Sequence, residues 1–344
     1  MKREESITLL KARMALARER LCEAAARRIG ASQPPPFPWI VTGIGSSEAH
    51  ARFLCSLVDR TAPGAATFAN PSSFAVSGPA APDGTLIVFS QGLSSNARIA
   101  LRHHPSFART VVFSAKEQDE TPFTGDEIEF VRCMETDEFT ILLRVIGPMV
   151  TYLTAWQWLH SVLPGTPAPP DPSEVGRIFS SVDETPRETV DALAEDFISG
   201  VEFNFIGPAN DYPQNLGFKR VEGLFLPEPV RRDILQAAHG PIQQNHAEPC
   251  AQWIFTSASA AETALAAHLL PMFGRLDSPI RTIASPVPEP ASVFFFEALL
   301  NRALATAIHY SPHSQFDWPG KGLDGEGYHL ECPLPAAEDP PTNS

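Results

Sequence analysis

Two stretches of the chain carry side chains and backbone groups suited to holding an anion. Residues 43–47 read Gly-Ile-Gly-Ser-Ser and residues 90–95 read Ser-Gln-Gly-Leu-Ser-Ser, and each follows a short apolar run. A buried strand that leads through such a turn into a helix presents hydroxyls and free N–H groups at the positive end of the helix dipole. The two turns predict a phosphate-binding site, named here the phosphate cradle. The alternative is that their serines only cap the helices that follow.

A later part of the chain adds two further motifs. Residues 207–213 read Gly-Pro-Ala-Asn-Asp-Tyr-Pro, and residues 239–241 read His-Gly-Pro. Together with the phosphate cradle, they resemble the signatures of the double sugar isomerase (SIS) family, in particular the isomerase half of glucosamine-6-phosphate synthase and its stand-alone relatives. The resemblance covers residues 35–325 and implies an enzyme that acts on a sugar phosphate.

The resemblance also implies which residues hold the phosphosugar. The family has a serine and a glycine where Gly92 and Leu93 stand here, so one hydroxyl contact is lost while the Gly92 N–H remains. The binding residues that the resemblance implies are Ser46, Ser47, Ser90, Gln91, Gly92 and Ser95.

His239 belongs to the His-Gly-Pro motif. Imidazole exchanges a proton near neutral pH, which is what opening a sugar ring requires. In the resembled family this histidine opens the ring and comes from the neighbouring subunit. The resemblance therefore implies a catalytic His239 and a homodimer, whereas a purely structural histidine is the alternative.

Proton transfer between C1 and C2 of the open sugar needs a base, for which a glutamate with a burial-raised pKa is suited. The family spacing after Tyr-Pro places this base at Leu224, and Glu222 lies two residues earlier, about 200° around a helix. Glu222 is the predicted base if the helix is locally shifted, and Glu138 is another candidate carboxylate. Lys219 and Arg220 either contact the ligand or form a solvated helix face.

The family also carries lysines that this chain only partly matches. Residues 145–148 read Val-Ile-Gly-Pro, with no lysine where the family has one before the last helix of its first domain. Lys321 corresponds to the family's C-terminal lysine but lies three residues early. The resemblance implies a catalytic or sugar-contacting role for Lys321.

The elements that must position these residues alternate between apolar strands and helices, which predicts parallel sheets covered on both faces. We expect an α/β protein with two tandem SIS domains, each a three-layer, flavodoxin-like unit. The expected strands are 39–42, 85–89, 110–114, 202–206, 252–256 and 279–283. The expected division is an N-terminal helix at 1–30, a first domain at 31–163, a Pro-rich linker at 164–176, a second domain at 177–332 and a disordered tail at 333–344.

Composition narrows the function classes. A formal net charge of −14 without a basic patch argues against a nucleic-acid partner. The five cysteines are scattered without Cys-x-x-Cys spacing, which predicts a reducing, cytoplasmic setting and no structural zinc. No apolar run is long enough to span a bilayer, so we expect no membrane partner. Neither a metal nor a cofactor is expected.

The resemblance thus implies an aldose–ketose phosphosugar isomerase that acts on a sugar 6-phosphate through ring opening and an enediol, either alone or coupled to deamination of an amino sugar. The second hypothesis is a non-catalytic protein that binds a phosphosugar as a sensor. A dinucleotide-binding dehydrogenase is a distant third, because the Gly43-x-Gly45 turn lacks a third glycine at the usual spacing.

Overall fold

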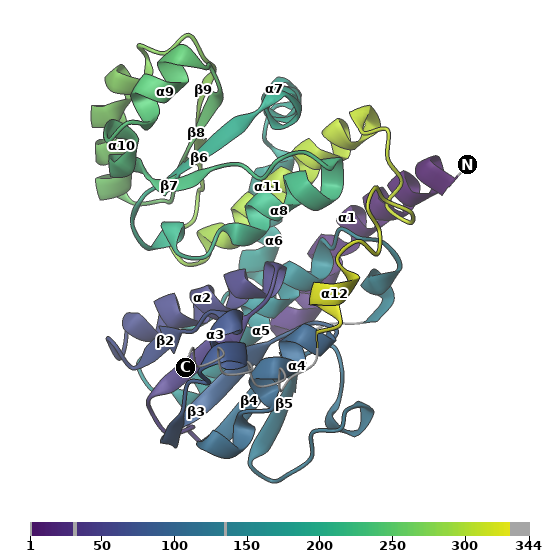
Figure 1. Cartoon of the computed structure of the whole chain (residues 1–344). Helices are drawn as coiled ribbons and strands as arrows, with labels where there is room; N and C mark the ends of the chain where they lie inside the picture. The colour runs from purple at the N-terminus through teal and green to yellow at the C-terminus, as the bar shows by residue number, and fades with distance from the viewer. Residues whose placement is uncertain (1, 30–32, 134–135, 331–344) are drawn as a thin grey trace, which may run out of the picture.

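The structure is a computed structural model and describes residues 2–29, 33–133 and 136–330. Two parallel sheets lie at opposite ends of the molecule with helices α5, α8 and α11 between them (Figure 1). The predicted tail at 333–344 falls outside the described residues. No helix in the described ranges is long and apolar enough to cross a membrane.

The first sheet has five parallel strands in the order β2-β1-β3-β4-β5. This is the flavodoxin-like order, and its switch point lies between β1 and β3. Val41 pairs with Ile87 and Gly43 with Phe89, so the carboxyl ends of these two strands lie side by side. The strands are β1 Trp39–Gly43, β2 Ala66–Phe68, β3 Ala81–Phe89, β4 Phe107–Ser114 and β5 Ile128–Arg132.

Helices cover both faces of this sheet because its strands are apolar on both faces. Ile87 and Val111 face α2 and α5, whereas Val88 and Val112 face α3 and α4. The helices of this half are α1 Lys2–Ala26, α2 Ser46–Asp59, α3 Pro71–Val76, α4 Ser95–Leu101 and α5 Ile146–Val162.

The second sheet repeats the first four strands of this plan, in the order β7-β6-β8-β9 and again all parallel. One face carries a stacked aromatic layer in which Phe203 lies 5.3 Å from Trp253 between ring centroids. The strands are β6 Val201–Phe205, β7 Arg231–Asp233, β8 Ala251–Thr256 and β9 Ile280–Ala284. The helices are α6 Pro172–Asp183, α7 Arg187–Ser199, α8 Gln214–Leu224, α9 Pro241–Ala247, α10 Ala260–Phe273, α11 Ser292–Ala307 and α12 Gly325–Tyr328.

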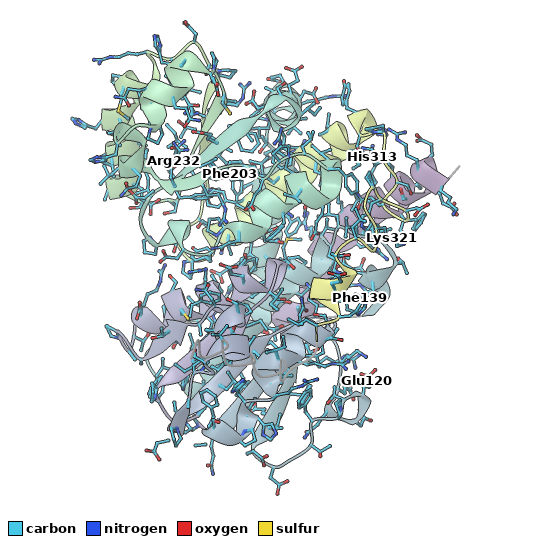
Figure 2. The ribbon with its side chains drawn as sticks, viewed as in Figure 1. Glu120, Phe139, Phe203, Arg232, His313 and Lys321 are labelled. Atoms are coloured by element: carbon cyan, nitrogen blue, oxygen red, sulfur yellow. The ribbon has the colours of Figure 1, made fainter. Side chains whose placement is uncertain are left out.

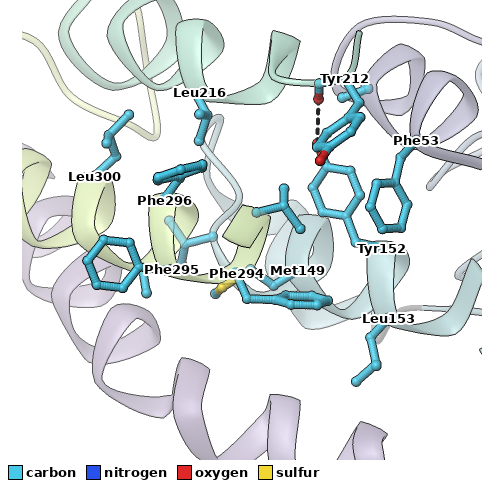
Figure 3. Packing of buried hydrophobic residues seen from close by; sticks show 14 of the residues in the cluster. Phe53, Met149, Tyr152, Leu153, Tyr212, Leu216, Phe294, Phe295, Phe296 and Leu300 are labelled. Atoms are coloured by element: carbon cyan, nitrogen blue, oxygen red, sulfur yellow. Dashed lines mark hydrogen bonds between the residues drawn. The ribbon is translucent and has the colours of Figure 1, made fainter. Parts of the chain in front are cut away.

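A continuous apolar core joins the two halves (Figure 3). Phe53 of α2 packs edge-on against Tyr212, with ring centroids 5.0 Å apart. The Tyr152 hydroxyl of α5 donates to the Tyr212 carbonyl at 3.0 Å, as the dashed line in Figure 3 marks. The two sheets are therefore held in one fixed arrangement, which matters because the functional residues come from both halves.

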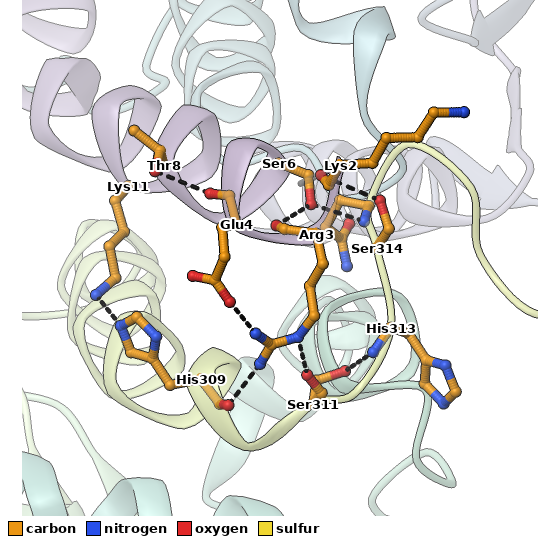
Figure 4. Close-up of polar contacts among 11 residues, drawn as sticks. Lys2, Arg3, Glu4, Ser6, Thr8, Lys11, His309, Ser311, His313 and Ser314 are labelled. Atoms are coloured by element: carbon orange, nitrogen blue, oxygen red, sulfur yellow. Dashed lines mark hydrogen bonds and ion pairs between the residues drawn. The ribbon is translucent and has the colours of Figure 1, made fainter.

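Helix α1 fastens the end of α11 and the loop after it to the rest of the protein. The Arg3 side chain donates to the Ser311 carbonyl at 2.8 Å, and the Ser6 hydroxyl accepts from the Gln315 backbone N–H at 3.0 Å (Figure 4). These bonds fix the segment that follows residue 311 against the molecule.

The structure differs from the expected elements in two respects. The strands β2, β5 and β7 were not predicted, because they are short edge strands of three to five residues with few consecutive apolar side chains. Helix α6 begins at Pro172, inside the range expected to be linker. Asp171 caps this helix by accepting from the Glu174 N–H at 2.9 Å, and Pro172 is tolerated in the first turn.

Candidate functional site

The phosphate cradle lies at the switch point of the first sheet, where parallel α/β sheets bind their ligands. Gly45 has a φ of 62°, a left-handed conformation that glycine adopts without strain. A Cβ on Gly43 would lie 2.3 Å from the Ser47 carbonyl oxygen, so this position requires the absence of a side chain. The glycines thus let the chain turn tightly from β1 into α2.

Three serines of the cradle have hydroxyls without a hydrogen-bond partner in the part of the chain that the structure describes. Among the described residues, Ser46, Ser47 and Ser95 form no side-chain hydrogen bond. The residues at the N-caps of α2 and α4 are Gly45 and Ser94, and neither makes a side-chain cap bond. The serines therefore do not act as helix caps, and their hydroxyls are left for a ligand.

The second turn of the cradle is held rigidly. The Ser90 hydroxyl accepts from the Leu93 N–H at 3.1 Å, and the Gln91 carbonyl accepts from the Ala115 N–H at 3.0 Å. Leu93 adopts a left-handed φ of 49°, a conformation that costs energy for a side-chain-bearing residue, while its side chain is buried. Leucine thus adopts a glycine-like backbone conformation at the position where the resembled family has glycine.

Glu222 lies in the last turn of α8 and is half-buried. Its carboxylate makes no hydrogen bond and no ion pair with any described residue. Desolvation raises the pKa of Glu222 from 4.5 to about 7, although Arg144 and Lys219 pull it downward. Leu224, where the family spacing would place the base, is instead packed in the core. An unpaired carboxylate with a pKa near neutrality is what a general base requires.

Arg144 links Glu222 to the phosphate cradle, and the sequence analysis missed it. One Nη of Arg144 donates to the Gln91 Oε1 at 2.6 Å, and its guanidinium carbon lies 4.5 Å from the centroid of the Phe139 ring. The pKa of Arg144 is lowered by burial, which Glu222 opposes by electrostatic attraction. The signal in the sequence was a single arginine in the apolar run 141–146.

The fully buried Gln315 fixes the relative placement of Arg144 and Glu222. Its Oε1 accepts from the Leu143 N–H at 3.0 Å, beside Arg144, and its Nε2 donates to the Glu222 carbonyl at 2.8 Å. The Gln315 carbonyl also accepts from the Leu142 N–H at 3.1 Å. One side chain from the segment after α11 thus joins the two halves of the site.

Other candidate residues turn out to be structural. Glu138 accepts the N–H groups of residues 145–147 at 2.7–3.2 Å and so caps the start of α5. Lys219 is fully buried and pairs with Glu297 at 2.7 Å, and Arg220 donates to the Phe197 carbonyl at 2.6 Å. The prediction of a solvated face at these two positions was wrong, because α8 turns this side toward α11 and α7.

The structure does not bring His239 or Lys321 to the Glu222 carboxylate. His239 is exposed at the end of a short 3-10 helix, Ile234–Ala238, which contacts α9, β6 and β7 of the second half. Lys321 lies on the exposed loop between α11 and α12 (Figure 2), where it donates to the Phe316 carbonyl at 2.7 Å and stacks on Trp318. Both roles remain predictions.

A small cavity adjoins the cradle between the ends of β1 and β3 and the helices α3 and α4. It has room for about one water molecule, so a sugar phosphate must bind over the cradle rather than inside this cavity. Its lining is mainly apolar and consists of Thr42, Gly43, Ile44, Pro71, Val88, Phe89, Asn96, Ala97 and Ala100.

Comparisons with known proteins identify the fold. No protein-family model matches the sequence, and no curated protein matches it. Among solved structures, the C-terminal domain of glucosamine-fructose-6-phosphate aminotransferase from Francisella tularensis is 12% identical with a TM-score of 0.67, covering 89% of this chain and 97% of that one. Glucosamine-6-phosphate deaminase from Thermotoga maritima is 14% identical with a TM-score of 0.60, covering 93% and 98%. Tagatose-6-phosphate ketose/aldose isomerase from Escherichia coli is 12% identical with a TM-score of 0.61, covering 91% and 90%.

These matches run over nearly the full length of both partners. At such low identity the likeness concerns the fold, and it agrees with the two parallel, helix-covered sheets. The chain has the tandem SIS fold that its motifs predict, shared with phosphosugar isomerases and deaminases.

Proposed function

We propose that this protein is a phosphosugar isomerase that interconverts an aldose and a ketose phosphate, with Glu222 as the base. The observation that carries the proposal is the unpaired Glu222 carboxylate, whose pKa is raised to about 7, linked through Arg144 to a cradle with unused serine hydroxyls. Structural neighbours that act on sugar 6-phosphates support the same substrate class.

In the proposed reaction the cradle binds the phosphate through Ser46, Ser47 and Ser95 and the N–H groups at the starts of α2 and α4. Glu222 removes the proton from C2 of the open sugar, the C–H electron pair becomes the C1–C2 double bond, and the carbonyl pair moves to O1. Glu222 then returns this proton to C1, while a proton passes from O2 to O1. C1 is reduced and C2 is oxidised, so the reaction needs no external electron donor.

Ring opening requires a second proton-exchanging group. We assign it to His239 of a second copy of this chain, because His239 is exposed and its own sheet keeps it among α9, β6 and β7. The proposal therefore includes a homodimer. Sedimentation analysis should give twice the chain mass, and mixing His239→Ala with Glu222→Gln chains should restore part of the activity that each variant lacks alone.

Proton and phosphorus NMR in deuterated water test the proposal with a panel of sugar 6-phosphates and amino-sugar 6-phosphates. We expect deuterium at C2 of one substrate, and a loss of about 10²–10⁴-fold in Glu222→Gln. Glu262→Gln is the matched control, because Glu262 is a carboxylate of similar burial whose oxygens are already bound by the N–H and hydroxyl of Ser257. Exchange at the wild-type rate in Glu222→Gln would overturn the assignment of the base. Ammonia release from an amino-sugar phosphate would show that deamination accompanies isomerisation.

A non-catalytic phosphosugar binder is the second candidate. The observation that favours it is that neither His239 nor Lys321 contacts Glu222 within the part of the chain that the structure describes. Phosphorus shifts on binding without any deuterium exchange would establish this alternative.

A further inference from the structure

The proposed function leaves one group without a task, the guanidinium of Arg144. We propose that Arg144, held by Gln91, binds the two oxygens of the enediolate, and more generally any planar pair of oxygens that share a negative charge at the end of the sugar remote from the phosphate. This inference rests on the proposed function and adds to it a binding subsite for the reacting end of the substrate.

The first support is the state of Arg144 itself. Its Nε is buried and has no hydrogen-bond partner among the described residues, whereas one Nη is engaged by the Gln91 Oε1 at 2.6 Å. A guanidinium stays charged in proteins, and a buried N–H without a partner costs free energy. The Phe139 ring, 4.5 Å from the guanidinium carbon, supports the cation without using its N–H groups. Arg144 is thus held in place by Gln91 and Phe139, and its Nε–H remains available to donate to a ligand.

The second support is Gln91. Its side chain is 4% exposed, and its Nε2 is buried without a partner in the described ranges. Gln91 belongs to the same turn as Ser90 and Ser95, so a ligand whose phosphate occupies the cradle brings its other atoms near this amide. Two neighbouring side chains therefore offer N–H groups that no described residue accepts.

The third support is the relation between Arg144 and Glu222. The two attract each other, yet they form no direct ion pair in the described structure. Gln315 maintains this separation, because it binds the Leu143 N–H on one side and the Glu222 carbonyl on the other. A direct ion pair would stabilise the ionised carboxylate and weaken it as a base. Kept apart, the two groups can face the same C1–C2 bond.

The chemistry of the intermediate matches this pair. When Glu222 takes the C2 proton, negative charge develops on O1, next to the hydroxyl at O2. A guanidinium presents parallel N–H donors in a plane and so fits two adjacent oxygens. Donors already in place where charge develops lower the barrier without reorganisation. Arg144 transfers no proton in this step.

Binding without turnover provides the test. Gluconate 6-phosphate carries a planar carboxylate at C1, and sorbitol 6-phosphate has the same length and phosphate but no charge there. Calorimetry at pH 6, where Glu222 is largely protonated, should show a roughly 10–100-fold preference for the gluconate in the wild-type protein, from hydrogen bonds to a charged group. Arg144→Met should lose this preference while keeping its affinity for the sorbitol phosphate. Arg144→Lys should keep part of the preference.

Arg52→Met is the matched control. Arg52 also lies over an aromatic ring, 4.0 Å from the Phe68 centroid, and it pairs with Glu48 rather than with Gln91. Its removal should leave the preference intact. Equal wild-type affinity for both ligands, or an equal loss for both in Arg144→Met, would overturn the subsite while the cradle stands. If neither ligand bound, the proposed function itself would fall. Retained binding of sorbitol phosphate also shows that each variant is folded.

Discussion

The turns that follow corresponding strands of the two sheets have the same backbone plan but use their polar groups differently. Gly45 after β1 and Gly207 after β6 both lie two residues past their strand with φ values of 62° and 63°. After β3 the Ser95 hydroxyl has no partner among the described residues, whereas after β8 the Ser257 hydroxyl and N–H are both bound by the Glu262 carboxylate, at 2.8 and 2.6 Å. In the turn after β8, the Glu262 carboxylate therefore takes the place that we propose a ligand phosphate takes in the cradle.

A similar contrast holds around the helices that start at these turns. In the second half the Tyr212 hydroxyl donates to Glu289, which also pairs with Arg60, and Lys219 pairs with Glu297. In the first half, the groups without a partner among the described residues include the hydroxyls of Ser46, Ser47 and Ser95, the Gln91 amide nitrogen and the Arg144 Nε. The difference teaches that a repeated fold can keep its strand order while the polar groups at its turns find different partners.

The largest effect on stability should come from breaking the buried Lys219–Glu297 ion pair of the second half. Lys219→Met leaves the fully buried Glu297 carboxylate without its cation, and removing one partner of a buried ion pair costs about 3–5 kcal/mol of stability. Thermal unfolding should show this loss. The double variant Lys219→Met with Glu297→Leu is the control and should recover most of it. An unchanged unfolding temperature in the single variant would contradict the view that the second half is held by paired groups.

Removing hydroxyls from the cradle and from the turn after β8 should have opposite effects on binding and on stability. The pair Ser46→Ala and Ser95→Ala should weaken phosphosugar binding by roughly 100-fold and leave stability nearly unchanged, because these hydroxyls bond to no described residue and are proposed to bind the phosphate. The pair Ser257→Ala and Ser259→Ala should leave binding unchanged and lower stability. Calorimetric titration and thermal unfolding of both doubles decide between these outcomes, and the same loss of binding in both would remove the distinction.

The free carboxylate of Glu222 predicts a pH dependence. Its pKa is about 7 in the folded protein against 4.5 in an unfolded chain, so the folded state binds more protons between these values. Stability should therefore fall by about 2 kcal/mol as the pH rises from 4.5 to 7, while deuterium exchange rises through pH 7 as the base ionises. Urea unfolding at pH 5 and pH 8 measures the difference, and Glu222→Gln should lose the part that this carboxylate contributes. A variant as pH-sensitive as the wild type would exclude Glu222 as the source.

The smallest effect on stability should come from removing the Glu262 carboxylate that binds Ser257 in the turn after β8. Glu262→Ala frees the N–H and hydroxyl of Ser257 and should cost about 1 kcal/mol of stability. It should also let inorganic phosphate stabilise the variant more than the wild type, since an anion can take the place of the carboxylate. Unfolding temperatures with and without phosphate test this, and an equal phosphate effect in both proteins would contradict it.

The strands and the two turns of the cradle were predictable because their signals are local. A run such as Leu86–Phe89, with two β-branched residues and followed by Ser and Gly, is typical of a buried strand that enters a turn. The short edge strands were missed because their side chains are only partly buried. The raised pKa and missing partner of Glu222 could not be predicted from local sequence either. The family spacing places the base at Leu224, which is packed in the hydrophobic core.

The sequence by itself determined a repeated α/β plan, two serine-containing turns at the carboxyl ends of β1 and β3, and a carboxylate near the end of one helix. The tertiary structure alone decided that Gln91, Arg144, Glu222 and Gln315 meet. Arg144 and Gln91 are 53 positions apart in the chain, and Gln315 is 172 positions from Leu143. Such meetings depend on how α8 and the segment after α11 pack against the first half through the shared core. A local sequence pattern cannot predict these contacts, because the free energy of packing comes from contacts between segments that are distant in the chain.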